Sequence, residues 1–222
     1  MKYLFSTLLL SFMLFTAVFA QERKHSTFYE QRASLFEILP ASSQDILFLG
    51  NSITNGCEWS ELFQDVRIKN RGISGDITRG VYDRLDPIVK GRPAKIFLLI
   101  GINDIARGIP ADTIVQNISM ILQKIRRESP GTKLYLQSIL PVNDCYGKFK
   151  DHTSRGEIAA RINEQLRSIA QKTQITYIDL WTHFADPVSG KMNPDYTNDG
   201  LHLLGKGYLL WREIVLPYIQ EK

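Results

Sequence analysis

The chain of 222 residues has a formal charge of +4, 44% hydrophobic and 23% charged residues, and two cysteines. This length suits one domain with a substantial core, and the composition excludes a disordered chain and a small disulfide-stapled scaffold. The basic residues are scattered, with no basic stripe interleaved with aromatic residues, so we expect no nucleic-acid partner.

Residues 1–20 are predicted to be a secretory signal peptide. Lys2 is the only charged residue of this stretch, an almost unbroken apolar run follows it, and Ala20 offers a small residue at the expected cleavage point. The polar residues 21–26 contain no stop-transfer pattern, which favours an exported protein, periplasmic or secreted, over one held by an uncleaved membrane anchor. We expect the mature chain, residues 21–222, to have a charge of +3 because Lys2 is lost, and to make no stable membrane insertion after cleavage.

The mature chain begins with a helical apolar rhythm between Phe28 and Leu39 and then alternates short apolar runs with amphipathic segments. Strands are predicted at residues 46–49, 66–69, 95–100, 133–140 and 175–180, and helices at residues 77–90, 111–128, 154–171 and 205–219. Because strands and helices alternate, with no linker or repeat between them, the pattern predicts a single doubly wound α/β domain around a parallel sheet.

In such a domain, ligands bind at the carboxyl ends of the strands, near the point where the strand order reverses. The polar and glycine-containing segments lie there: GNSIT follows the first predicted strand, NRGISGD the second and GIND the third, while DGLH precedes the last helix. Motifs of dinucleotide enzymes, P-loop ATPases, zinc proteases and GxSxG hydrolases are absent from the sequence. It also has no Cys/His cluster with metal-ligand spacing, so we expect neither a cofactor nor a metal.

Ser52 is the best nucleophile candidate, since it directly follows a buried strand. A serine needs a base within hydrogen-bond reach and a third group that orients the base. Of the four histidines, only His202 has an acidic residue, Asp199, three positions before it in a glycine-containing turn, a spacing that can place carboxylate and imidazole on the same side.

The remaining histidines and the aromatic residues give weaker indications. His25 and His152 are expected to face solvent, and His183 could line a pocket. The aromatic residues near these segments form either a sugar-stacking or acyl-contacting wall or ordinary packing. They are Trp59, Tyr146, Trp181, Phe184 and Tyr196.

The two cysteines, Cys57 and Cys145, lie in predicted loops of a chain bound for an oxidising compartment. A disulfide and two free thiols are both compatible with the sequence, since a bridge depends on a Cα separation that spacing does not give.

Gly50-Asn51-Ser52, Gly75 of NRGISGD, Gly101-Ile102-Asn103-Asp104 and Asp199-Gly200-Leu201-His202 occur in one chain and in this order. In this the mature domain resembles the SGNH hydrolase superfamily, the GDSL-type esterases and lipases. The resemblance implies a three-layer α/β/α domain with a five-stranded, mainly parallel sheet of flavodoxin-like SGNH hydrolase fold. It also implies that Ser52 is the nucleophile, His202 the general base and acid, and Asp199 its orienting partner.

An oxyanion hole formed by the backbone N–H of Ser52 with Gly75 and Asn103 completes the implied site. A glycine lets a backbone N–H approach the reacting carbonyl without a Cβ, and an asparagine offers a neutral side-chain donor. One position departs from the family: the first block usually reads GDS, whereas this chain has Asn51. Aspartate there is not a member of the family's triad, so we expect Asn51 to brace the turn.

GNSIT, NRGISGD and DGLHLLGKGYLLW are most similar to the acetylhydrolase-like branch, which includes platelet-activating-factor acetylhydrolase subunits and bacterial carbohydrate acetylesterases. This implies an exported serine esterase that removes a short acyl group, O-acetyl above all, from a carbohydrate or another small ester through an acyl-serine intermediate. The alternatives are a lysophospholipase or thioesterase of the same superfamily and, less expected, a non-catalytic carbohydrate-binding protein. The expected partner is a small-molecule or oligosaccharide ester.

Overall fold

Five parallel strands form the central sheet of the computed structural model, which describes residues 25–221. The predicted signal peptide, residues 1–20, lies outside the described residues. The strand order is β2-β1-β3-β4-β5, and every neighbouring pair is parallel. The strands are β1 (Ile46–Gly50), β2 (Ile68–Gly72), β3 (Lys95–Leu99), β4 (Lys133–Gln137) and β5 (Thr176–Ile178).

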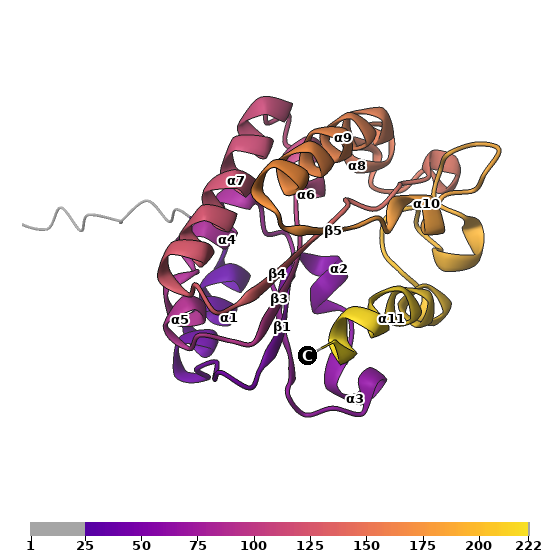
Figure 1. The fold of residues 1–222 in the computed structure, drawn as a ribbon. Coiled ribbons are helices and arrows are strands. Elements are labelled where there is room, and N and C mark those ends of the chain that lie inside the picture. Colours follow the sequence, from indigo (N-terminus) through magenta and orange to yellow (C-terminus); the bar gives the residue numbers. More distant parts are fainter. Residues whose placement is uncertain (1–24, 222) are drawn as a thin grey trace, which may run out of the picture.

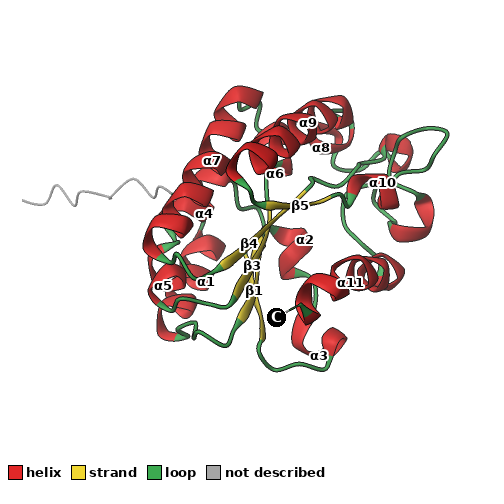
Figure 2. Cartoon of the chain, in the orientation of Figure 1, coloured by secondary structure: helices red, strands yellow, loops and turns green. Residues whose placement is uncertain are grey.

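Helices cover both faces of the sheet, with α4, α5 and α7 on one side and α2, α3 and α11 on the other (Figure 1). The strands run through the middle of the molecule between these layers (Figure 2). This is the expected three-layer α/β/α fold. The α-helices are α1 (Thr27–Ile38), α2 (Ser52–Asn55), α3 (Trp59–Phe63), α4 (Thr78–Asp83), α5 (Asp86–Lys90), α6 (Ile102–Ala106), α7 (Ala111–Glu128), α8 (Lys150–Thr153), α9 (Gly156–Thr173), α10 (Trp181–Phe184) and α11 (Gly205–Gln220), with short 3₁₀ turns η1 (Asp144–Tyr146) and η2 (Pro194–Tyr196).

Most element boundaries follow from local sequence. All side chains of β1 and β3 are buried, as their apolar runs predict, and α7 has the expected bounds, with five buried aliphatic residues on one face. The helix predicted at 77–90 is instead two helices, α4 and α5. Pro87 lies in the first turn of α5, where its missing N–H is tolerated, whereas inside a continuous helix it would remove a hydrogen bond.

The second predicted strand, 66–69, begins later and ends later than expected, at Ile68 and Gly72. The Asp65 carboxylate accepts hydrogen bonds from the backbone N–H and the guanidinium of Arg67, which makes this segment a turn and leaves Val66 exposed. The polar edge strand β2 is held by Asn70, whose amide donates to the carbonyl oxygens of Thr54 and Cys57. Strand β2 therefore ends level with β1, at the edge where the candidate residues lie.

Aromatic residues fill much of the core. The rings of Phe48 and Trp59 stack at 3.9 Å and those of Phe97 and Tyr135 at 4.4 Å. Trp59 is 1% exposed and Phe184 is completely buried. These two aromatic residues therefore pack in the core and do not form a wall that contacts substrate, which were the two roles compatible with the sequence.

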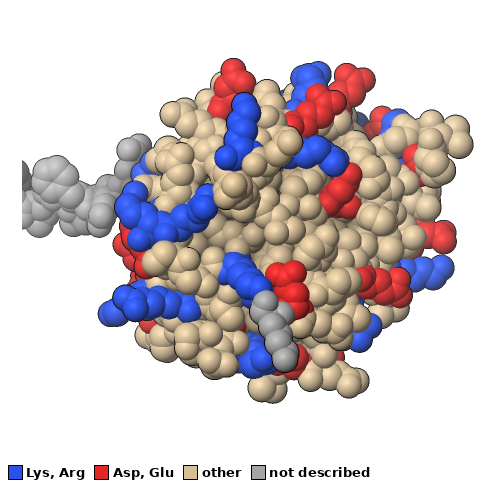
Figure 3. Space-filling view, viewed as in Figure 1, with Lys and Arg blue, Asp and Glu red and all other residues tan. Residues whose placement is uncertain are grey.

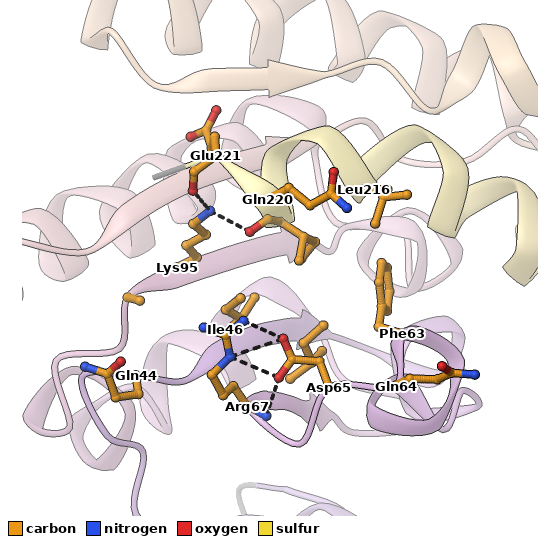
Figure 4. A pocket seen from close by; sticks show the side chains of 13 residues that line it. Gln44, Ile46, Phe63, Gln64, Asp65, Arg67, Lys95, Leu216, Gln220 and Glu221 are labelled. Atoms are coloured by element: carbon orange, nitrogen blue, oxygen red, sulfur yellow. Dashed lines mark hydrogen bonds and ion pairs between the residues drawn. The ribbon is translucent and has the colours of Figure 1, made fainter.

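At the amino end of the sheet, Lys95 anchors the C-terminus of α11. Its ammonium donates to the backbone carbonyls of Tyr218, Ile219 and Glu221, beside a hollow of about 530 Å³ (Figure 4). A cation at a helix C-terminus satisfies carbonyls that have no partner within the helix and interacts favourably with the helix dipole.

Acidic and basic side chains are interspersed on the face of the molecule shown in Figure 3. No helix within residues 25–221 combines the length and the apolar character needed to cross a membrane.

Cys57 is buried and Cys145 is exposed, and both are free thiols, which settles the question that the sequence left open. Burial raises the pKa of the Cys57 thiol to about 12, so this cysteine is a poor nucleophile at neutral pH.

Candidate active site

Ser52, His202 and Asp199 form a continuous hydrogen-bonded chain. The Ser52 hydroxyl oxygen lies 3.1 Å from Nε2 of His202, and Nδ1 of the same ring lies 2.8 Å from Oδ2 of Asp199. Ser52 is separated from His202 by 150 positions in sequence. The structure therefore brings together the three residues that the sequence selected, in the order nucleophile, base and orienting carboxylate.

The turn that carries Asp199 holds its carboxylate in one orientation. Oδ1 accepts hydrogen bonds of 2.8 Å from the backbone N–H groups of Leu201 and His202, which leaves Oδ2 for the imidazole. Gly200 has φ +86°, and a Cβ there would lie 1.8 Å from the carbonyl oxygen of Asn143. Only glycine fits this turn, because both its conformation and its close approach to the neighbouring loop exclude a side chain.

Two opposing effects act on the Asp199 carboxyl group. Burial acts to raise its pKa, but hydrogen bonds from the backbone N–H groups of His202 and Leu201 and from the His202 ring outweigh burial and hold the pKa below its usual range. The group is thus a carboxylate at neutral pH, as is required to fix the imidazole tautomer and to stabilise an imidazolium.

The candidate nucleophile, Ser52, is the first residue of α2, two positions after the end of β1. The residue before it, Asn51, is completely buried, and its Oδ1 accepts a hydrogen bond of 3.0 Å from the backbone N–H of Ile53. Asn51 therefore caps the start of α2 and braces the turn, as expected for this departure from the family pattern. Ser52 remains partly exposed at the mouth of the sheet.

The predicted oxyanion donors lie after the two strands that flank β1. Gly75 follows β2 and has φ +77°, and a Cβ built on it would meet no atom within 4 Å. Glycine is therefore favoured at position 75 by its left-handed backbone, and not by contact with another part of the chain. The space that a Cβ would enter is open. Asn103, in α6 after β3, is 7% exposed, and its side-chain amide donates to the backbone carbonyl of Asp76 at 2.8 Å.

A buried ion pair joins the loops that carry these groups. The Arg84 guanidinium donates to Oδ2 of Asp76 at 2.9 Å, to the carbonyl of Arg71 in β2, and to the carbonyl of Gly50 at the end of β1. Burial raises the pKa of Asp76 in spite of the opposing effect of Arg84. Arg84 lies in the short break between α4 and α5 and belongs to no motif, so it was not among the residues predicted from the sequence.

A second buried carboxylate, Asp104, connects the loops after β2 and β3. It accepts hydrogen bonds from both the backbone N–H and the hydroxyl of Thr78, and burial raises its pKa to about 6 although these hydrogen bonds oppose the shift. The sequence neighbours of Gly75 and Asn103, Asp76 and Asp104, are thus both held by buried polar contacts.

The structure corrects two of the expectations for histidines. His152 is partly buried, and its Nε2 lies 2.9 Å from Oδ1 of Asn103, so it contacts the candidate site and does not face solvent. His25 is also partly buried, paired with Asp83 and stacked on Tyr29. His183 is exposed on α10. The sequence feature that could have indicated His152 is its place after β4, at the same edge of the sheet as the motifs.

Phe149 adds an apolar group beside the imidazole. Its ring lies edge-on to that of His202 at a centroid distance of 5.0 Å, it is 45% exposed, and its backbone is left-handed, with φ +48°. A non-glycine residue in this conformation is uncommon and costs conformational energy, which the surrounding loop must offset. Together these groups give an accessible serine with a base, a fixed carboxylate, two flanking donors and an apolar edge, an arrangement suited to acyl transfer.

Among residues 25–221, no group of three or more His, Cys, Asp or Glu side chains is arranged to hold a metal ion. The hollow in Figure 4 lies at the opposite end of the strands from Ser52 and is lined by Lys95, which is engaged with α11, and by the Asp65–Arg67 pair. Its lining therefore lacks the chemistry found at the carboxyl edge.

The chain is similar to known proteins in sequence. Residues 48–210 match the GDSL-like lipase/acylhydrolase family. The chain is 27% identical over 188 residues to platelet-activating factor acetylhydrolase IB subunit alpha2 of Rattus norvegicus, an alignment that covers 80% of this chain and 78% of the relative.

Solved structures share the fold. A protein from Streptococcus pneumonia, provisionally described as a platelet-activating factor, has a TM-score of 0.80 and 31% identity, covering 86% of this chain and 92% of its own. The acetyl xylan esterase AlAXEase has a TM-score of 0.65 and 19% identity, covering 79% of this chain and 99% of its own, which is a likeness of fold alone.

Proposed function

Since the chain belongs to the GDSL-like lipase/acylhydrolase family and is therefore a hydrolase of ester bonds, we propose that it acts as a serine esterase, with Ser52 as nucleophile, His202 as general base and acid, and Asp199 as the orienting carboxylate. The observation that carries this assignment is the hydrogen-bonded chain from Ser52 Oγ through both ring nitrogens of His202 to Asp199. The two backbone donors on Asp199 support it, because they leave one carboxylate oxygen for the imidazole.

In the first half-reaction, Nε2 of His202 takes the proton of Ser52 while the hydroxyl oxygen attacks the ester carbonyl. The oxyanion that forms accepts hydrogen bonds from the backbone N–H of Ser52 and from Gly75 and Asn103, and Asp199 stabilises the imidazolium. His202 then returns the proton to the departing alcohol, leaving an acyl-serine. Water repeats the sequence with the same base, releases the carboxylic acid and restores the Ser52 hydroxyl.

The proposed substrate is a short-chain ester, O-acetyl above all, on a carbohydrate or another small molecule. The similarity to acetylhydrolase subunits supports the acetyl group, and an acetyl xylan esterase with the same fold is compatible with a carbohydrate alcohol. The exposed ring of Phe149 beside His202 offers an apolar contact that a longer acyl chain would also use. A series of p-nitrophenyl esters from acetate to octanoate separates these cases: activity that rises with chain length would favour the lysophospholipase or thioesterase alternative.

An acetate-release screen tests the proposal directly. The wild type and the Ser52→Ala variant are incubated with acetylated sugars, xylan fragments, acetylated sialic acids and lysophospholipids, with and without a chelator. We expect acetate from one class of sugar ester, loss of release in Ser52→Ala, and no effect of the chelator. Turnover that persists in Ser52→Ala, or that a chelator abolishes, would contradict the serine mechanism, and absence of any turnover would favour a non-catalytic binding protein.

Export is a further part of the proposal, supported by the pattern of residues 1–20. Mass spectrometry of protein recovered from the periplasm or medium of an expressing bacterium should find an N-terminus close to Gln21. An intact N-terminus in the membrane fraction would favour an anchored protein.

A further inference from the structure

The amide group of Asn103 is held from both sides. Its Nδ2 donates to the backbone carbonyl of Asp76 at 2.8 Å, and its Oδ1 lies 2.9 Å from Nε2 of His152. A carbonyl oxygen can only accept a hydrogen bond, so the nitrogen of the amide must be on the Asp76 side. The amide oxygen then faces His152, which must donate to it through Nε2–H.

This arrangement is relevant to the oxyanion hole that we propose. An asparagine amide contributes only if its NH₂ group, and not its oxygen, faces the developing negative charge. Nδ2 carries two hydrogens, and the Asp76 carbonyl takes one of them; the other has no partner among residues 25–221. Without a donor on its oxygen, the amide would be held by one contact alone, and rotation about its last torsion would cost less.

His152 suits this task by its charge state. Burial lowers its pKa, the positive charges of His202, Arg107 and Arg155 lower it further, and Asp151 alone opposes them. A neutral imidazole has one N–H, and the contact with Asn103 places it on Nε2. A neutral ring also adds no positive charge beside His202 when that residue becomes an imidazolium.

The segment that carries His152 is fixed on the site. The backbone N–H groups of His152 and Thr153 donate to the carbonyl of the left-handed Phe149, and the Thr153 hydroxyl donates to the carbonyl of Lys148. Asn143, midway between β4 and α8, contacts the DGLH turn: its backbone N–H donates to the carbonyl of Gly200 at 2.8 Å. The loop after β4 is therefore docked against the turn of Asp199 and His202.

We propose that His152 is a positioning residue of the oxyanion hole: through its hydrogen bond to Asn103 Oδ1 it holds the Asn103 amide with its nitrogen towards the reacting carbonyl. The inference rests on the proposed function. Because His152 acts on Asn103 and not on substrate, its loss should lower kcat and leave KM nearly unchanged.

The test is a double-mutant cycle on p-nitrophenyl acetate, with thermal melting to confirm that each variant folds. We expect His152→Ala to lower kcat about 10- to 100-fold, less than the 10²- to 10³-fold loss that removal of an oxyanion donor causes, with KM changed less than about 2-fold. His152→Gln, which keeps an N–H donor, should stay within about 5-fold of the wild type. In an Asn103→Ala background, His152→Ala should change kcat less than about 2-fold, since the group it positions is gone.

The exposed His183 provides the matched control: His183→Ala should leave kcat and KM unchanged. Two results would overturn the positioning role and indicate direct contact with substrate. One is that the losses of kcat in Asn103→Ala and His152→Ala add up in the double variant. The other is that His152→Ala acts mainly by raising KM. Normal kcat in His152→Ala would overturn it as well. These outcomes differ from failure of the proposed function, in which turnover would not depend on Ser52 at all.

Discussion

Arg84→Met is the substitution for which the structure makes the sharpest stability prediction. The side chains of Arg84 and Asp76 are 3% and 1% exposed and lie 2.9 Å apart. Removing one partner of a buried ion pair costs about 3–5 kcal/mol, because the other charge remains buried without compensation. For a chain of this size, each kcal/mol lowers the melting temperature by about 2–4 °C, so we expect a loss of roughly 6–20 °C at pH 7.

The pH dependence of this loss tests its physical cause. Burial already raises the pKa of Asp76 in the presence of Arg84, and removal of the guanidinium must raise it further. A carboxyl group whose pKa is raised by folding contributes stability below its unfolded pKa of about 3.9, and this contribution is lost as the pH rises through the folded value. The difference between wild type and Arg84→Met should therefore be largest near pH 7 and shrink towards pH 4.

Urea unfolding followed by tryptophan fluorescence at several pH values measures both effects. Arg79→Met is the matched control. Arg79 is half exposed and pairs with Asp83 one turn along α4, and an ion pair with such access to solvent contributes about 1 kcal/mol or less. Adding Asp76→Asn to Arg84→Met should recover part of the stability by removing the uncompensated charge. A destabilisation equal at pH 4 and pH 7, or no larger than that of the control, would refute the reasoning.

Three further predictions concern buried or catalytic polar groups. Asp199→Asn should lower kcat about 10⁴-fold without unfolding the chain. The two backbone donors hold the amide oxygen, so the NH₂ group faces Nδ1 of His202 and forces the ring proton onto Nε2, and Nε2 then cannot accept the proton of Ser52. Ester kinetics within 10-fold of wild type would contradict this. Lys95→Met should lower the free energy of unfolding by about 2 kcal/mol and speed amide hydrogen exchange in the last turn of α11. Unchanged exchange there would show that the capping contacts do not stabilise the helix. Since the pKa of Asp104 is raised to about 6, ionisation of this carboxyl group lowers the stability of the folded chain as the pH rises from about 4 through 6. The urea midpoint of Asp104→Asn should therefore fall less over this range than that of the wild type. Midpoints that change in parallel with pH would refute the raised pKa.

Local sequence predicted the features that depend on local contacts. The apolar runs of β1 and β3 and the single buried face of α7 specify their own structure, and Asp199 and His202 lie in one turn. The family resemblance added Gly75 and Asn103, and the fold it implied is confirmed. By contrast, the predicted boundaries of β2 and of the helix at 77–90 were wrong, because a side-chain turn at Asp65 and a proline at 87 determine them.

The polar network behind the site could not be predicted in this way. His152 contacts Asn103 across 49 positions and Arg84 contacts Gly50 across 34, and neither residue belongs to a periodic pattern or a motif. A polar residue in a loop is usually solvated, which is the reason for the wrong expectation for His152. Only the position of the loop after β4, at the carboxyl edge of the sheet, connects it with the site, and that argument applies equally to every residue in the loop.

Asn51 illustrates what the nucleophile turn requires of its sequence. The turn uses one acceptor, Oδ1, for the N–H of Ile53, and the residue is completely buried. The Nδ2 group of Asn51 has no hydrogen-bond partner among the described residues. An aspartate would supply the same acceptor for Ile53 but would bury a negative charge in this unpartnered position. The amide supplies the cap at the smaller cost of one unsatisfied donor, because burying a neutral amide costs less than burying an unpaired carboxylate. The capping oxygen, and not the charge of the usual aspartate, is therefore what keeps Ser52 in place in this chain.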